Sequence, residues 1–126
     1  MDVIQAEPVV IGEMPRCIEE CLTCHRQCLE AAAHLLSNGG GGESELVLQL
    51  WDCADICQTS AHFMLRGSAL VVRTCEAYAE VCELCARECG RFVDDVRLQT
   101  CAEACRRCAG SCRDMAKLHR NHTQHM

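Results

Sequence analysis

Apolar and polar positions follow the period of an amphipathic α-helix in four separate stretches of this chain. In each stretch cysteine, leucine or methionine recurs three and four residues apart, which places these side chains on one helical face. Two stretches carry four cysteines each at the same spacing: Cys17, Cys21, Cys24, Cys28 and Cys101, Cys105, Cys108, Cys112. A third stretch repeats the spacing with one substitution: Cys75, Tyr78, Cys82, Cys85 and Cys89. A fourth stretch keeps only two of its cysteines: Cys53, Cys57, Ser60 and Met64.

Helix-breaking residues separate the four stretches. Pro15 suits the first turn of a helix, where its missing N–H costs nothing. Glycines after Asn38, then Gly67-Ser68 and Gly90, are typical of helix ends, and Asp94 or Asp95 is a suitable cap for the last helix. The sequence therefore predicts an N-terminal extension, four helices that form one bundle, and a polar C-terminal tail: 1–14, then 15–37, 44–66, 69–89 and 95–119 within a bundle of 15–119, then 120–126.

Four helices of similar length with short connections predict an all-α fold, an antiparallel up-down-up-down four-helix bundle. On a heptad grid the cysteines take the inward-facing positions of every helix, so the core is expected to be lined by cysteine. Antiparallel stacking predicts four layers: Cys28, Cys53, Cys89, Cys101; Cys24, Cys57, Cys85, Cys105; Cys21, Ser60, Cys82, Cys108; and Cys17, Met64, Tyr78, Cys112, with Cys75 beyond. Past the thiols, one end is expected to be an apolar plug of Leu35, Leu46, Leu50, Phe92 and Leu98. The other end is expected to be a rim of thioether and imidazole groups: Met14, Met64, Met115 and His119.

Composition narrows the class of protein. Cysteine fills 14 of 126 positions, a density usual in secreted disulfide scaffolds. The first residues, however, lack the basic and apolar regions of a signal peptide, and no segment is apolar enough to span a bilayer. We therefore expect a cytoplasmic protein with reduced thiols. Its formal charge of −6 disfavours binding to nucleic acid or to an anionic membrane.

The cysteines could serve as core residues, as disulfides or as metal ligands. Cysteine in a core behaves as a small hydrophobe, but at fourteen positions it would leave the bundle underpacked. Disulfides between helices are geometrically possible, although a reducing compartment disfavours them. Among metals, zinc requires four tetrahedral ligands in separate closed sites, and iron–sulfur motifs place cysteines in loops. A continuous row of thiolates best suits many Cu(I) ions, because Cu(I) is soft and accepts bridging sulfur.

These repeated C-x₃-C-x₂-C-x₃-C stripes on an all-helical chain resemble the four-helix-bundle copper storage proteins of bacteria, in particular their cytosolic branch. The resemblance covers about residues 15–119. It implies storage and buffering of multiple Cu(I) ions, protection against copper toxicity, access of copper from one end, and assembly as a homotetramer. It also implies that all fourteen cysteines are metal ligands, with Met64, Met115 and His119 as candidates at the mouth.

Two other functions stay open on the sequence alone: a thiol redox or disulfide-stabilised interaction protein, and a thiolate buffer for another soft metal such as zinc. We expect no enzymatic activity, because no catalytic triad, phosphate loop or paired carboxylates can be identified. His25, His34 and His62 lie off the cysteine stripes and are expected to flank the core rather than bind metal. A further stripe on the first helix is expected to complete the core or to contact another subunit: Ile18, Leu22, Leu29 and Leu36.

Overall fold

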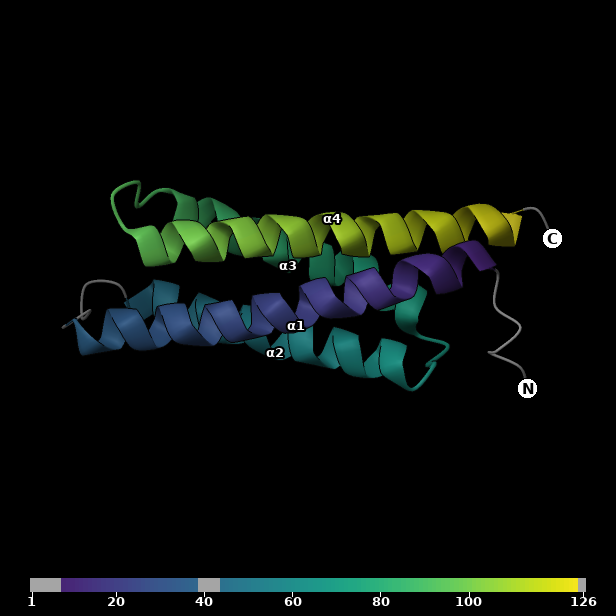
Figure 1. The fold of residues 1–126 in the computed structure, drawn as a ribbon, viewed down its shortest axis with the longest axis horizontal. Helices are drawn as coiled ribbons and strands as arrows, with labels where there is room; N and C mark the ends of the chain where they lie inside the picture. The colour runs from purple at the N-terminus through teal and green to yellow at the C-terminus, as the bar shows by residue number, and fades with distance from the viewer. Residues whose placement is uncertain (1–7, 39–43, 125–126) are drawn as a thin grey trace.

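Four long helices make up the part of the chain that the structure, a computed structural model, describes: residues 8–38 and 44–124, with side chains for 13–38 and 44–117. The helices are α1 (Pro8–Ser37), α2 (Ser44–Leu65), α3 (Val71–Gly90) and α4 (Val96–Gln124). They run up, down, up and down, and each packs against its two neighbours in the ring α1–α2–α3–α4 (Figure 1). The predicted fold class is therefore confirmed.

The outer helices are longer than the sequence predicts. α1 begins at Pro8, so Pro15 lies inside the helix rather than in its first turn. Because proline has no N–H, the backbone hydrogen bond from residue 15 is missing there. α4 continues to Gln124, well into the stretch expected to be a polar tail. Both expected borders of the bundle thus fall inside helices, while residues 1–7 lie outside the described part.

Local hydrogen bonds define the end of α2 and the start of α4. Gly67 adopts a positive φ of 66°, and the amides of Gly67 and Ser68 donate to the carbonyls of Met64 and Phe63 at 3.1 and 2.9 Å. This pair of bonds is a Schellman motif, which closes the end of α2. At the start of α4, Asp95 Oδ1 accepts a hydrogen bond from the Leu98 amide at 3.1 Å, which makes Asp95 the cap.

The interior differs in composition along its length. All fourteen cysteines are buried, and the predicted apolar plug lies beyond them, near the α1–α2 and α3–α4 connections. Leu50 and Leu98 are fully buried there, Leu35 and Leu46 nearly so, and Phe92 packs against them while half-buried. At the opposite end, where the chain termini lie, Met64 and Met115 are buried and Met14 is half-buried (Figure 1).

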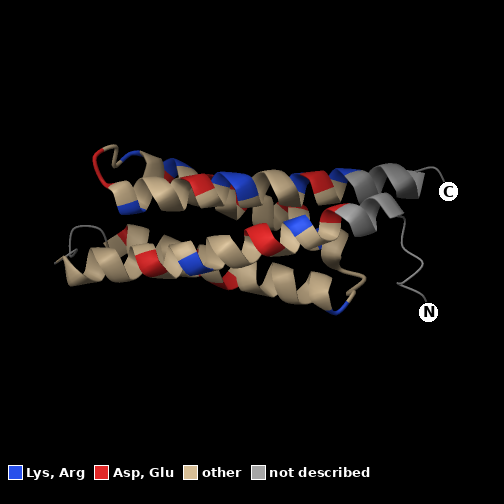
Figure 2. Ribbon diagram, viewed as in Figure 1, with Lys and Arg blue, Asp and Glu red and all other residues tan. Residues whose placement is uncertain are grey.

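Charged residues occur along α1 and α4, as the blue and red segments show (Figure 2), and none of those whose side chains the structure describes is buried. Ion pairs join α1 to α4 at three levels: Glu30 with Arg97 at 2.9 Å, Glu20 with Arg107 at 3.4 Å, and Arg16 with Asp114 at 3.4 Å. Exposed pairs of this kind add little stability, but they match the two helices in one register. That register also aligns the thiols of α1 with those of α4.

Candidate metal centre

The cysteines form one buried array to which all four helices contribute. No cysteine side chain is more than 1% exposed, and every one is a free thiol. Small alanines such as Ala31 and Ala102 complete the inner faces of the helices, which lets the backbones approach closely. The predicted cysteine-lined interior is therefore confirmed.

The thiols of α1 and α4 meet in four rungs, and all four pairs are those expected from the repeated motif. The Sγ–Sγ distances are 3.7, 3.6, 3.5 and 4.0 Å for Cys28–Cys101, Cys24–Cys105, Cys21–Cys108 and Cys17–Cys112. Because both helices carry the same spacing, matching one rung matches the rest.

The register between α2 and α3 differs from the prediction. Cys82 Sγ lies 3.6 Å from Cys57 Sγ and 3.8 Å from Cys53 Sγ, instead of opposite Ser60. Cys57 Sγ also lies 3.8 Å from Cys108 Sγ, and Cys53 Sγ lies 3.9 Å from Cys24 Sγ. Cys82 remains grouped with Cys108 as predicted, so α2 is the helix that is shifted along the bundle.

The prediction that Tyr78 faces the interior of the bundle is wrong. Its side chain is only half-buried, whereas Ala79 is fully buried and takes the inward position between Cys75 and Cys82. Cys75 therefore reaches the level of Cys112, with which its thiol interacts. Partial burial and the neighbouring Cys75 raise the pKa of the Tyr78 phenol.

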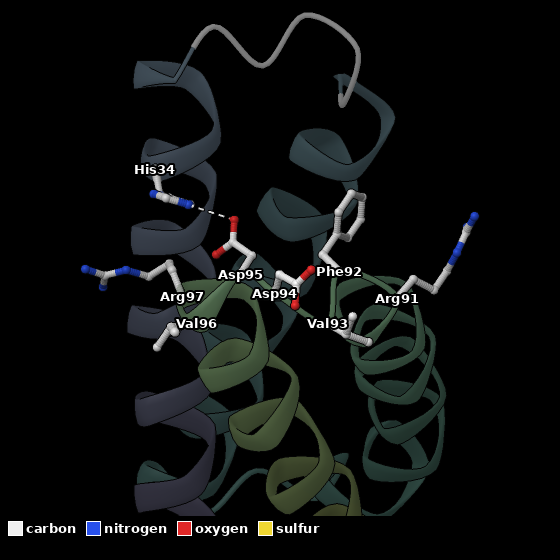
Figure 3. Close-up of a pocket in the computed structure, with 8 residues that line it drawn as sticks. All are labelled: His34, Arg91, Phe92, Val93, Asp94, Asp95, Val96 and Arg97. Atoms are coloured by element: carbon white, nitrogen blue, oxygen red, sulfur yellow. Dashed lines mark hydrogen bonds and ion pairs between the residues drawn. The ribbon is translucent and has the colours of Figure 1, made fainter.

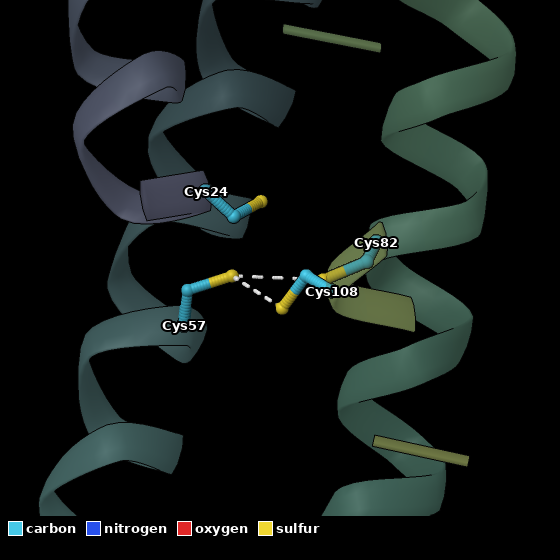
Figure 4. A group of neighbouring side chains, drawn as sticks. All are labelled: Cys24, Cys57, Cys82 and Cys108. Atoms are coloured by element: carbon cyan, nitrogen blue, oxygen red, sulfur yellow. Dashed lines mark hydrogen bonds between the residues drawn. The ribbon is translucent and has the colours of Figure 1, made fainter. Parts of the chain in front are cut away.

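Three groups of sulfur atoms are compact enough to surround a metal ion, with all atoms of a group within 4.8 Å of one another. Two groups have four thiols and one has three: Cys24, Cys57, Cys82, Cys108; Cys24, Cys28, Cys53, Cys105; and Cys17, Cys21, Cys112. Figure 4 shows the first group, in which thiols of α2, α3 and α4 converge with Cys24 of α1. Cys24 belongs to both four-thiol groups, so these are not independent closed sites.

Contacts between the thiols raise the pKa of some cysteines and lower that of others. Hydrogen bonding with Cys105 lowers the pKa of Cys24, while hydrogen bonding with Cys101 and Cys24 raises that of Cys105. At the ends of the array, interaction with Cys112 and burial raise the pKa of Cys75, and interaction with Cys101 and burial raise that of Cys89. Protons are thus shared over a coupled network, and most thiols must lose one to bind metal.

The remaining predicted side chains fall into two sets. Ser60 lies on the inner seam, 1% exposed, as do Met64 and Met115 at 3% and 1%. The side chain of His119 lies outside the described residues, so its role stays a prediction. Whether any of the predicted ligands binds metal also stays a prediction, because the arrangement alone tests only their placement.

The other described histidines are turned to other partners or to the surface. His25 Nδ1 lies 2.8 Å from the Ala54 carbonyl of α2, and His62 is exposed. His34 Nε2 lies 3.0 Å from Asp95 Oδ2 at the edge of an open cleft of about 640 Å³ (Figure 3). Backbone and side chains of residues 91–97 line this cleft, which contains no thiol. The candidate thiol ligands therefore lie in the interior rather than in this surface hollow.

Comparison with known proteins supports this assignment. The chain is 35% identical over 101 residues to an uncharacterised cysteine-rich protein, YhjQ, of Bacillus subtilis strain 168, covering 79% of this chain and 93% of that protein. Its fold is similar to that of a cytosolic copper storage protein from Streptomyces lividans, solved with five coppers. Their TM-score is 0.83 and their identity 32%, with 88% of this chain and 98% of that chain covered.

A second solved structure, the Cu(I)-bound copper storage protein BsCsp3, matches with a TM-score of 0.78 and 33% identity over 82% of this chain and 98% of that chain. The sequence profile of copper storage proteins matches residues 10–117, which include every cysteine of the four stripes. A buried thiol array in a four-helix bundle, together with a profile match over most of the chain, places this chain in the copper storage protein family.

Proposed function

We propose that this protein stores and buffers many Cu(I) ions on the thiolates inside its bundle, limiting copper toxicity and supplying copper on demand. One observation carries the proposal: fourteen free thiols are buried inside the bundle, and eleven of them are linked to one another by Sγ–Sγ distances of 3.5–4.0 Å. Two or three sulfurs satisfy a Cu(I) ion, and a thiolate can bridge two ions, so such an array holds ions in series. The family match and the copper-bound structures of similar proteins support the same metal.

A zinc buffer is the second candidate, because two groups have the four thiols that a structural zinc site requires. The two groups share Cys24, however, so they cannot both be closed tetrahedral sites with separate ligands. Shared ligands favour bridged Cu(I) over isolated zinc. We propose that the array stores ions without a catalytic step, a role supported by the match to the copper storage family.

Copper is proposed to enter at the end that carries Met14, Met64 and Met115, with His119 as a further candidate ligand there. Buried leucines such as Leu50 and Leu98 close the opposite end, whereas at the thioether end Met14 is only half-buried, which supports entry there. Thioethers are soft ligands that bind Cu(I) without losing a proton, so they suit brief capture before transfer to thiolates.

We also propose that the protein works in the cytoplasm as a homo-oligomer, most simply a homotetramer. Within the described residues, no helix combines the length and apolarity that crossing a bilayer requires. Leucines 22, 29 and 36 of α1 and Trp51 of α2 are 37–53% exposed, which leaves an apolar surface suited to another copy of the chain. Light scattering coupled to size-exclusion chromatography tests this: a monomeric mass at micromolar concentration would contradict it.

A Cu(I) titration of the reduced metal-free protein against a competing chelator tests the storage function. We expect many equivalents per chain, approaching the number of thiols, because each ion needs only a share of the array. The same titration with Zn(II) should reach far fewer equivalents. A plateau at only a few Cu(I) ions, matched by zinc, would reject storage in favour of discrete zinc sites.

A further inference from the structure

Ser60 interrupts the sulfur array on α2. Its side chain is 1% exposed, and its Oγ lies 3.6 Å from Cys21 Sγ. Cys21 in turn lies 3.5 Å from Cys108 and 3.9 Å from Cys112, so Ser60 falls at the level between these two α4 thiols. At this level α2 contributes a hydroxyl, which is a hard and weak ligand for Cu(I).

Ala79 interrupts the array on α3 at the same level. It is fully buried and lies on the inner face between Cys75 and Cys82. The Cys75 thiol interacts with Cys112, and Cys82 belongs to the four-thiol group that contains Cys108. Ala79 therefore also lies between the levels of Cys108 and Cys112, and α3 offers only a methyl group there.

The two interruptions divide the thiols into unequal groups. The outer group, toward the thioether end, has one member from α3, one from α4 and two from α1: Cys17, Cys21, Cys75 and Cys112. The inner group, toward the leucine plug, contains the other ten: Cys24, Cys28, Cys53, Cys57, Cys82, Cys85, Cys89, Cys101, Cys105 and Cys108. Both four-thiol groups lie in the inner group, whereas the three-thiol group of Cys17, Cys21 and Cys112 lies in the outer group.

Contacts between the two groups converge on Cys108. Its Sγ lies 3.5 Å from Cys21 Sγ, and its thiol also interacts with Cys112 one turn along α4. On the inner side it lies 3.8 Å from Cys57 Sγ. In the described part of the chain, the short thiol contacts that cross this level all include Cys108.

We propose that Ser60 and Ala79 form a thiol-poor waist, and that Cu(I) passes between the outer and inner groups by way of Cys108. The proposal rests on the proposed storage of Cu(I). Ions move along such an array by exchange from one thiolate to the next, so a level with fewer sulfurs slows their passage. The outer group then fills and empties quickly, while the inner group, with more thiols around each ion, retains copper.

Loading kinetics test the waist. The reduced metal-free protein is mixed with Cu(I) held by a weak chelator, and the near-ultraviolet absorbance of the Cu(I)–thiolate bonds is followed in time. The wild type should load in a fast and a slow phase. Cys108→Ser should slow the slow phase several-fold. The matched control Cys101→Ser removes an inner thiol of the same helix away from the waist, and should reduce the slow amplitude without changing its rate.

Ser60→Cys supplies the converse test. Added to Cys108→Ser, it places a sulfur beside Cys21 on α2 and should restore the rate of the slow phase. Alone, it should speed that phase in the otherwise wild-type protein, which keeps the proposal testable if Cys108→Ser fails to fold. A single loading phase in the wild type, equal slow rates in Cys108→Ser and Cys101→Ser, or no effect of Ser60→Cys would overturn the waist. A low copper plateau would instead reject the storage function itself.

Discussion

His34 Nε2 lies 3.0 Å from Asp95 Oδ2, and this pair ties the last turns of α1 to the start of α4 at the leucine-sealed end. Asp95 has a second role, since its Oδ1 caps α4 through the Leu98 amide. Partial burial raises the pKa of Asp95, but the hydrogen bonds from His34 and the Leu98 amide outweigh it and hold that pKa below its ordinary value. One carboxylate thus stabilises both a helix end and the closure of the bundle.

Asp95→Ala should lower the free energy of unfolding by about 1 kcal/mol or somewhat more, the usual cost of losing a cap. Asp95→Ser keeps a capping oxygen but loses the contact with His34, so it should lower the free energy of unfolding by less than Asp95→Ala does. Comparing the two variants separates the capping role from the contact with His34. Because the pKa of Asp95 is depressed in the fold, its contribution is present above the ordinary aspartate pKa of about 4 and is lost as pH falls through the folded value. Denaturant unfolding of both variants at neutral and acidic pH measures this; equal stability of Asp95→Ala and wild type at neutral pH would contradict it.

Leu98→Ala should weaken the plug. Leu98 is fully buried at the end of the array, so truncation should lower the free energy of unfolding by about 2–5 kcal/mol. Val96→Ala on the same helix is a matched control, because Val96 is 80% exposed and should change stability little. Chemical denaturation measures both, and similar losses in the two variants would show that the plug does not stabilise this end.

Copper binding should weaken as the pH falls. Hydrogen bonding with neighbouring thiols, and then burial, raise the pKa of Cys17, Cys75 and Cys89, so these groups hold protons at neutral pH that an incoming ion must displace. Each proton released per ion lowers the apparent affinity about tenfold per pH unit in the range below the thiol pKa values. Competition titrations at several pH values provide the slope, and an affinity independent of pH would mean that the ligands are not protonated thiols.

Loading should leave the backbone almost unchanged. The four helices pack through a shared buried core that includes leucine, valine and alanine as well as cysteine, so we expect copper to induce no further folding. Far-ultraviolet circular dichroism should therefore change little between the metal-free and loaded protein, while thermal stability rises because the metal binds only the folded state. A large gain in helicity on loading, as in zinc fingers, would contradict a preformed array.

A count of reactive thiols separates storage from the redox alternative. All fourteen cysteines are free thiols. Under anaerobic, metal-free and denaturing conditions, a thiol reagent should therefore modify fourteen groups per chain. A value well below this, restored by a reductant, would indicate disulfides and favour the alternative role.

Sequence patterns predicted the interior better than the helix limits. The rungs between α1 and α4 followed from the spacing alone, because both helices repeat one motif. The register of α2 did not, since it depends on how this helix packs against its neighbours along its length. Whether Ala79 or Tyr78 of α3 points inside depends on the rotation of that helix about its axis.

The start of α1, the end of α4 and the histidine contacts could not be predicted from the sequence patterns, for other reasons. Pro15 is a good helix start, and the rule that proline disfavours a helix interior gave no sign that α1 begins at Pro8. The polar residues after Lys117 carry no apolar period that would predict their helix. The partners of His25 and His34 depend on how each helix is rotated about its axis, a quantity that no local pattern specifies.

The location of bound copper tests the central claim most directly. Crystals of the fully loaded protein, measured above and below the copper absorption edge, reveal each ion by its anomalous scattering. We expect many copper peaks inside the bundle, each within bonding distance of cysteine sulfurs, from the level of Cys17 and Cys112 to that of Cys28 and Cys101. Copper confined to surface carboxylates and histidines, with an interior free of metal, would contradict the account.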